Sequence, residues 1–220
     1  MHRPAAQPRT LSPDRTAKLR LYLVADPDHT PGDFIAMIEA ALNGGVTAVQ
    51  LRCKHRPDRE VFELARRARA LTREHEALFL INDRVDIALA SDADGVHLGV
   101  DDLPIEDARR IGGPDFVIGY SPETDEQTQD AATRGVDYLG VGPVFGTATK
   151  SDAGTAIGLQ TVTQRADLAG IPIIGIGGIT ASNARSVIDA GAVGVAVVSA
   201  ISIQGDPRYA AEMLRRALDA

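Results

Sequence analysis

The sequence predicts a single (β/α)8 barrel, the TIM-barrel fold class, and three observations lead to it. Strand-like and helix-like segments alternate from Leu21 onward, which indicates a parallel sheet. Eight such units fill the two hundred residues that remain, and eight is the number that closes this barrel. The strand-like runs are rich in Val, Ile and Leu without strict alternation, as expected of strands covered on both faces. A doubly wound sheet of six or seven strands is the alternative, but it leaves the last units without a role.

The predicted strands are short apolar runs at 21–25, 48–51, 78–81, 95–98, 116–119, 138–141, 171–176 and 193–198. The clearest predicted helices are 33–42, 59–75, 125–134, 181–190 and 207–218. In the second of these, Val61, Ala65 and Ala68 recur on one face at helical spacing. Glycines such as Gly44, Gly135 and Gly191 end helices just before strands, as expected of C-terminal caps.

Composition and charge exclude several classes of function. The net charge of −7 makes non-specific nucleic-acid binding improbable, and the longest apolar run, nine residues, is too short to cross a membrane. Residues 1–20 are basic, contain Pro4, Pro8 and Pro13, and are predicted to be a flexible tail before a catalytic domain at 21–220. One cysteine and no secretory signal predict a cytoplasmic protein. The sequence leaves open whether the chain forms a homo-oligomer.

In a barrel of this class, the residues that act on a ligand follow the carboxyl ends of the strands. Polar or glycine-rich ends follow seven of the eight predicted strands. They are Gln50, Arg52 and Lys54; Asn82 and Asp83; Asp101 and Asp102; Ser121; Thr147, Thr149 and Lys150; Gly177 and Gly178; and Ser199. Their joint placement predicts one site at that end of the barrel.

Three cations, Arg52, Lys54 and Lys150, belong to this set in a chain that is acidic overall. Such a cluster predicts a ligand with several negative charges, such as a phosphate or diphosphate. Each cation alone is also explained by a surface ion pair. The glycine-rich segment 175–180 precedes a predicted helix and suggests a second anion site, because backbone N–H groups can approach the ligand there. A turn capped by Ser182 is the alternative.

Two carboxylates, Asp83 and Asp102, have two interpretations. With water and substrate phosphate oxygens they would suit Mg²⁺. Alternatively, Asp83 caps a helix at 84–90 and Asp102 caps the helix that Pro104 begins, which spacing alone favours.

Two further residues could carry chemistry and are interpreted as not doing so. His97 lies within an apolar strand, so we interpret it as a packing histidine. Cys53 has no evident histidine partner and is interpreted as a bystander thiol, although its neighbours Arg52 and Lys54 could lower its pKa.

The chain resembles the thiamine-phosphate synthase family, also called thiamine-phosphate pyrophosphorylase, over about residues 21–201. The resemblance rests on segments 50–54, 81–86, 95–102, 119–121, 140–150 and 175–179. The Asn82-Asp83 pair and the later Thr147-x-Thr149-Lys150 element, in this order, are its most specific motifs.

The resemblance implies that 4-amino-5-hydroxymethyl-2-methylpyrimidine diphosphate and a thiazole phosphate combine to give thiamine phosphate and diphosphate. It implies that Gln50, Arg52, Lys54, Asn82, Ser121 and Lys150 bind the pyrimidine diphosphate, with Arg52, Lys54, Ser121 and Lys150 acting in catalysis. It assigns Thr147, Thr149, Gly178, Val198 and Ser199 to the thiazole phosphate, and it reverses the capping interpretation by assigning Asp83 and Asp102 to Mg²⁺.

This chain departs from the family pattern at Cys53, Val100 and Pro122-Glu123, none of which is an assigned site residue. Two other functions stay open. An isomerase-type barrel, such as a thiazole tautomerase or sugar-phosphate epimerase, would need an acid–base pair and one phosphate site. A catalytically silent barrel that binds a phosphorylated ligand is the third interpretation.

Overall fold

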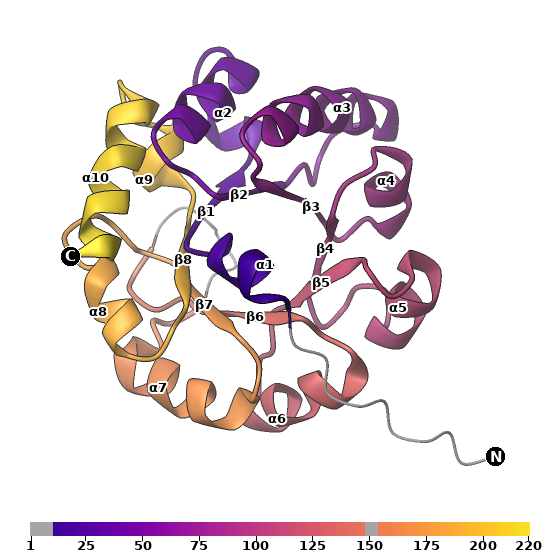
Figure 1. The fold of residues 1–220 in the computed structure, drawn as a ribbon, viewed down its shortest axis with the longest axis vertical. Helices are drawn as coiled ribbons and strands as arrows, with labels where there is room; N and C mark the ends of the chain where they lie inside the picture. Colours follow the sequence, from indigo (N-terminus) through magenta and orange to yellow (C-terminus); the bar gives the residue numbers. More distant parts are fainter. Residues whose placement is uncertain (1–10, 148–153) are drawn as a thin grey trace.

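The computed structural model describes residues 11–147 and 154–220, and it confirms the predicted barrel (Figure 1). Eight parallel strands close in chain order, with β8 paired to β1. They are β1 (Leu21–Ala25), β2 (Ala48–Leu51), β3 (Leu78–Asn82), β4 (Gly95–Leu98), β5 (Val117–Tyr120), β6 (Tyr138–Val141), β7 (Ile173–Ile176) and β8 (Gly194–Val197). Closure brings the carboxyl ends of all eight strands to one end of the barrel.

The longer helices form a ring outside the strands (Figure 1). They are α2 (Phe34–Asn43), α3 (Asp58–Glu74), α4 (Val85–Ala90), α5 (Ile105–Gly112), α6 (Asp125–Arg134), α7 (Gly158–Ala169), α8 (Ala184–Asp189) and α10 (Pro207–Asp219). Two short helical turns follow strands, namely η1 (Pro27–His29) after β1 and α9 (Ser199–Ser202) after β8. Among the described residues, no helix combines the length and the apolar character needed to span a membrane.

Alternate residues of each strand divide the core into two layers. The inner core fills the barrel with Tyr22, Val24, Ala48, Leu78, Leu80, Val117, Tyr138, Ile174 and Ala196. The outer core packs the other face of the strands, for example Leu23, Val49 and Phe79, against the helices. Because both faces are buried, the strands read as continuous apolar runs rather than as an alternating pattern.

The amino end of the barrel is covered by α1 (Pro13–Ala17), which lies over its centre in Figure 1. The helix begins at Pro13, and the Ser12 hydroxyl accepts a hydrogen bond from the Arg15 amide. Leu11 and Leu19 pack against the inner core, and Leu19 is fully buried. The predicted flexible tail is therefore wrong for residues 11–20, because proline in the first turn starts a helix instead of breaking one. Residues 1–10 lie outside the described part.

Several element boundaries differ from the prediction, those of β3, β5, β7 and β8 among them. The fifth strand runs one residue later than 116–119, and the helix predicted at 181–190 begins only at Ala184. The side chain of Asn183 explains the late start, because its amide accepts from the Thr180 backbone N–H and donates to the Gly178 carbonyl. These bonds hold residues 178–183 in a turn.

Two aspartates that precede even-numbered strands tie neighbouring units together. Asp94, before β4, accepts from the Phe79 backbone N–H at 2.8 Å and from both terminal nitrogens of Arg69. Asp137, before β6, accepts from the Ile118 backbone N–H at 2.8 Å and from Arg109 at 2.6 Å. The same device thus joins β3 to β4 and β5 to β6.

We predict that Asp137→Ala lowers the free energy of unfolding by about 3 kcal/mol, because Arg109 then loses its buried partner. Asp107 offers the control, since its pair with Arg110 is exposed and should contribute under about 1 kcal/mol. Urea unfolding of both variants measures the difference. Equal losses of stability would contradict the role given to Asp137.

Candidate active site

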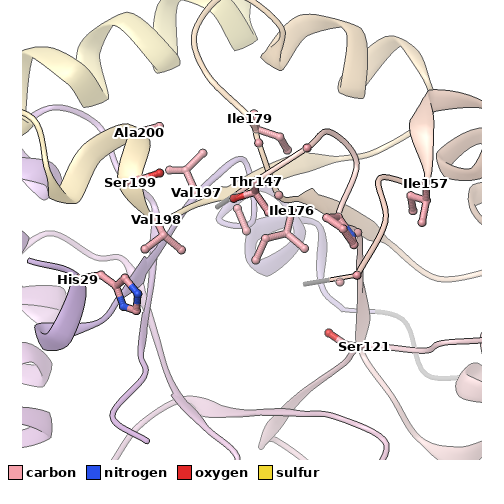
Figure 2. A pocket seen from close by; sticks show the side chains of 18 of the residues that line it. His29, Ser121, Thr147, Ile157, Ile176, Ile179, Val197, Val198, Ser199 and Ala200 are labelled. Atoms are coloured by element: carbon pink, nitrogen blue, oxygen red, sulfur yellow. The ribbon is translucent and has the colours of Figure 1, made fainter. Parts of the chain in front are cut away.

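Two adjoining cavities open at the carboxyl end of the barrel. The smaller, of about 180 Å³, is lined in part by Gln50, Arg52, Lys54, Asn82, Asp83, Asp102 and Ser121. The larger, of about 1290 Å³, is lined in part by Ser121, Thr147, Gly178, Val198 and Ser199 (Figure 2). The described residues predicted for the pyrimidine diphosphate and the metal thus line the smaller cavity, and the described residues predicted for the thiazole phosphate line the larger, with Ser121 on both. Thr149 and Lys150 lie outside the described residues.

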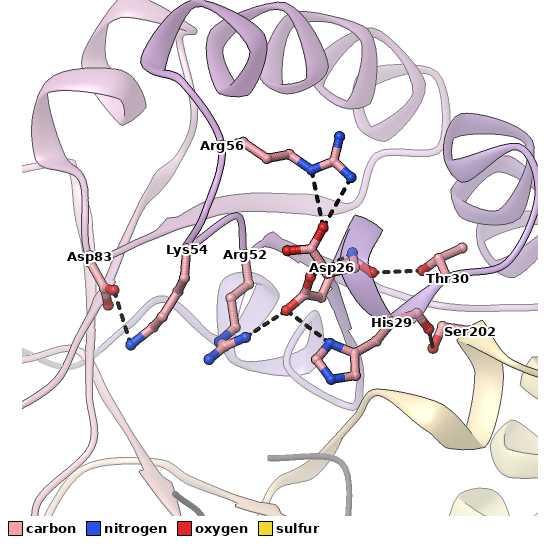
Figure 3. A network of polar contacts seen from close by, with 9 residues as sticks. Asp26, His29, Thr30, Arg52, Lys54, Arg56, Asp83 and Ser202 are labelled. Atoms are coloured by element: carbon pink, nitrogen blue, oxygen red, sulfur yellow. Dashed lines mark hydrogen bonds and ion pairs between the residues drawn. The ribbon is translucent and has the colours of Figure 1, made fainter. Parts of the chain in front are cut away.

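Arg52 is fixed by a buried carboxylate that follows β1 (Figure 3). Its guanidinium lies 2.5 Å from Asp26, whose side chain is only 4% exposed. His29 approaches the same carboxylate at 3.3 Å, and Thr30 donates its hydroxyl hydrogen to the Asp26 carbonyl. The sequence analysis missed Asp26 and His29. The first predicted strand was the one strand after which no site residue was assigned, and the acid directly after it was a signal that could have found Asp26.

Lys54 and Asp83 form a looser pair at the opening of the smaller cavity. Lys54 Nζ lies 3.6 Å from the Asp83 carboxylate, and the lysine side chain is 42% exposed (Figure 3). Burial is the main cause that raises the pKa of Asp83 to about 6, and the neighbouring Asp102 carboxyl adds to it. Lys54 opposes this rise only in part. The two carboxyl groups therefore face each other in a partly dry site.

Neither aspartate caps a helix. The residue before α4 is Arg84 and the residue before α5 is Pro104, and neither end carries a side-chain cap. Asp102 instead accepts from the Gly99 backbone N–H at 2.6 Å, which closes the turn after β4. The capping interpretation that spacing favoured is therefore wrong for both residues.

Asp83 and Asp102 are a donor set that Mg²⁺ can use. Among residues 11–147 and 154–220, no group of three or more His, Cys, Asp or Glu side chains could hold a metal ion. Mg²⁺ does not need such a cage, because it is held by one or two carboxylates with water and substrate phosphate oxygens. Asp83 and Asp102, close enough to raise a pKa and unused as caps, fit that requirement.

The glycine-rich turn after β7 packs against the segment after β6. Gly178 has a φ of +65°, and a Cβ there would lie 2.6 Å from the Gly146 carbonyl oxygen. Glycine is thus required for the close approach of two backbones at the wall of the larger cavity. The short helix α9 begins at Ser199 on the same wall. Loops after the seventh and eighth strands with a short extra helix form the usual phosphate site of this fold class.

His97 is more than a packing residue. Its Nε2 lies 2.8 Å from Ser121 Oγ, and its Nδ1 lies 2.9 Å from the Tyr138 hydroxyl. It also lines the smaller cavity, so the interpretation from its apolar strand was incomplete. Tyr22 lines the same cavity and was likewise missed, since a tyrosine in an apolar strand looks like core.

Comparison with known proteins agrees with this arrangement. Residues 21–201 match the family model described as thiamine monophosphate synthase. The chain belongs to the thiamine monophosphate synthase family. It is therefore a transferase of thiamine biosynthesis.

Relatives support the assignment along nearly the whole chain. A thiamine-phosphate synthase of Haloarcula marismortui is 50% identical over 90% of this chain and 96% of its own. One of Pyrococcus furiosus is 45% identical over 92% and 96%. The structure of a thiamine phosphate pyrophosphorylase from Pyrococcus furiosus superposes with a TM-score of 0.85 at 43% identity, over 93% of this chain and 97% of that one.

The pKa of the Cys53 thiol is raised, although two cationic residues flank it in the sequence. Burial is the main cause that raises the pKa of the thiol to about 12, and Asp26 adds to the rise. The lowering that Arg52 and Lys54 could cause does not occur, because burial and the carboxylates of Asp26, Asp28 and Glu60 outweigh the opposing charge of Arg56. In this member of the thiamine monophosphate synthase family, the thiol stays protonated at neutral pH.

We predict that Cys53 reacts slowly with iodoacetamide, with a rate that still rises above pH 10, because only the thiolate attacks. An ordinary thiol would reach its plateau soon above its usual pKa of about 8.5. Mass spectrometry of the alkylated protein over pH 7–11 measures the profile. A plateau below pH 9 would show that the cations dominate.

Proposed function

We propose that this transferase joins 4-amino-5-hydroxymethyl-2-methylpyrimidine diphosphate to 4-methyl-5-(2-phosphoethyl)thiazole, with Mg²⁺ assisting the departure of diphosphate. The smaller cavity receives the pyrimidine diphosphate and the larger cavity receives the thiazole phosphate. The observation that carries this proposal is the division of the two residue sets between two cavities that adjoin at Ser121. Two substrates held this way would meet at the shared wall.

The cations bind the diphosphate in different ways. Arg52, held by buried Asp26, is a fixed donor toward the leaving group. Lys54 is more exposed and can turn from Asp83 toward a phosphate oxygen. Lys150, assigned from the sequence, is the third cation of this set. Because negative charge grows on the leaving oxygen as its bond breaks, cations placed there stabilise the transition state more than the ground state.

Asp83 and Asp102 would hold Mg²⁺ against the diphosphate. When bound, the ion supplies positive charge to the leaving group. The amino group of the pyrimidine can delocalise the charge left on its methylene carbon. The thiazole nitrogen then attacks with its own lone pair, so the reaction needs no general base. A protonated Cys53 is consistent with that chemistry, since a thiolate has no part in it.

Incubation of the purified protein with both substrates and Mg²⁺, followed by mass detection of thiamine phosphate, tests the proposal. Omission of either substrate or addition of a chelator should abolish product. Conversion of a thiazole alone would favour the isomerase-type barrel, and binding heat without turnover would favour the silent binding module. A cytoplasmic location belongs to the same proposal, with the free thiol of Cys53 as its support.

We predict that Asp83→Asn lowers kcat by a factor on the order of 10² to 10³, the scale for losing one electrostatic stabiliser. Asp86→Asn is the matched control, because Asp86 lies three residues further on, is exposed and pairs with Arg84. The control should retain nearly full activity in the same steady-state assay. Loss of activity in both variants would point to a general charge effect.

The same variant should change stability with a defined pH dependence. The pKa of Asp83 in the folded protein, about 6, exceeds its ordinary 3.8, so folding favours the protonated acid. That contribution to stability is present below about pH 4 and is lost as the pH rises through about 6. Asp83→Asn should therefore be more stable than the parent at pH 8 without metal. Thermal unfolding of the parent and the variant at about pH 4 and at pH 8 should show the gain in stability only at pH 8.

We predict that Asp26→Asn raises the KM for the pyrimidine diphosphate roughly tenfold, the effect expected when a charged hydrogen bond that orients Arg52 is weakened. The KM for the thiazole phosphate should change by less than about twofold. Asp28→Asn is the control, because its carboxylate pairs with Arg56 rather than with Arg52. An equal rise in both KM values would mean that the whole opening had shifted.

A further inference from the structure

Five polar side chains form a continuous chain of hydrogen bonds across the barrel. Gln50 Nε2 donates to the Tyr22 hydroxyl at 2.8 Å, and the hydroxyls of Tyr22 and Tyr138 lie 2.9 Å apart. Tyr138 then contacts His97 Nδ1 at 2.9 Å, and His97 Nε2 contacts Ser121 Oγ at 2.8 Å. We call these five residues the polar chain. Its two ends, Gln50 and Ser121, both line the smaller cavity.

The barrel leaves space for this chain at two glycines. A Cβ on Gly119 would lie 2.3 Å from the Tyr138 hydroxyl and 2.4 Å from His97 Nδ1. A Cβ on Gly140 would lie 3.1 Å from His97 Cε1 and 3.2 Å from Ser121 Oγ. Any side chain at position 119 would therefore displace the central contact of the polar chain. The contact depends on a strand position without a side chain.

The hydrogens of the polar chain can be assigned in order. Burial raises the pKa of both tyrosines well above its usual value, so each hydroxyl keeps its hydrogen. Among the described residues, Tyr22 has two polar partners at its hydroxyl, Gln50 and Tyr138. It accepts from Gln50, so its own hydrogen goes to Tyr138, because a buried hydroxyl without an acceptor is costly.

The same order of donor and acceptor continues along the polar chain from Tyr138 to Ser121. Tyr138 accepts from Tyr22 and donates its hydrogen to His97 Nδ1. A neutral imidazole that accepts at Nδ1 carries its hydrogen on Nε2, which donates to Ser121 Oγ. Ser121 thus has its own hydroxyl hydrogen left to offer, and Gln50 has its carbonyl oxygen. One end of the polar chain is an acceptor and the other a donor.

We propose that Tyr138 is a positioning residue that sets this direction through Tyr22 and His97, so that the site selects an amino-substituted pyrimidine over its oxo analogue. The inference rests on the proposed function, since it concerns the substrate of the smaller cavity. An amino group donates to the Gln50 carbonyl, and an unprotonated ring nitrogen accepts from Ser121. A 4-oxopyrimidine presents a carbonyl and a ring N–H instead, which opposes both ends.

The first test is the tautomer of His97 in the substrate-free protein. ¹⁵N NMR of histidine-labelled protein, with His97 assigned by the signals lost in His97→Asn, should show the proton on Nε2. Tyr138→Phe should yield a mixture of both neutral tautomers, because Nδ1 then loses its donor. A wild-type proton on Nδ1, or an unchanged tautomer in the variant, would overturn the proposal. This measurement requires no turnover.

The second test is discrimination between substrates. We expect the wild-type protein to prefer the 4-amino over the 4-oxo pyrimidine diphosphate by a factor on the order of 10⁴ in kcat/KM, as for sites built around a substrate hydrogen bond. Tyr138→Phe should narrow that ratio at least tenfold and leave the KM for the thiazole phosphate unchanged. An unchanged ratio would overturn the proposal.

Matched variants separate positioning from loss of folding. Tyr120→Phe removes a hydroxyl from another buried tyrosine, one in the outer core, and should keep the full preference. Tyr22→Phe breaks the polar chain one residue nearer Gln50 and should narrow the ratio as Tyr138→Phe does, even where the latter is unstable. If the wild-type protein forms neither thiamine phosphate from the 4-amino pyrimidine nor the corresponding coupled product from the 4-oxo pyrimidine, the proposed function fails, whereas the His97 tautomer still decides the direction of the polar chain.

Discussion

Closure of the barrel with strands of four or five residues governs the position and depth of the site. Each strand has only two or three inward positions, and they change character along its length. In β2 the inward residues are Ala48 and then Gln50, and in β3 they are Leu78, Leu80 and then Asn82. The apolar layer fills the barrel, whereas the polar layer above it lines the smaller cavity. Because the strands are this short, each strand contributes only one inward residue to the depth of the site.

Charge at the opening is arranged in pairs of unequal rigidity. The side chain of Arg52 is 12% exposed and lies against a nearly inaccessible Asp26, whereas that of Lys54 is 42% exposed and lies 3.6 Å from Asp83. An exposed pair at that separation contributes little to stability, so Lys54 loses little when it turns toward another anion. If Arg52 moved away from Asp26, it would leave a buried carboxylate without its ion-pair partner, which is costly. The first cation is therefore built into the scaffold, and the second is available to the ligand.

The sequence predicted the barrel because strand spacing and apolar runs depend on neighbouring residues. Four strands, 21–25, 48–51, 95–98 and 138–141, have the predicted bounds. It failed where one side chain decides the outcome, as at Pro13, which starts a helix, and at Asn183, which delays one. Within the site, the sequence identified the polar residues that follow the strands. It did not identify Tyr22, His97 and Tyr138 as site residues, because a buried hydrogen bond between strands that are distant in sequence leaves no local pattern.

The backbone at Asp83 supports a role for its carboxylate beyond local structure. Its φ of +63° lies in the left-handed region, which costs a residue with a Cβ roughly 1 kcal/mol. Its backbone N–H donates to the His97 carbonyl, so the strained turn joins the ends of β3 and β4. Glycine would make the same bond without strain, and the carboxylate caps no helix. An acid that adds strain and resists ionisation at this position, and that has Lys54 as its ion-pair partner, is consistent with the proposal that it shares a cation with Asp102.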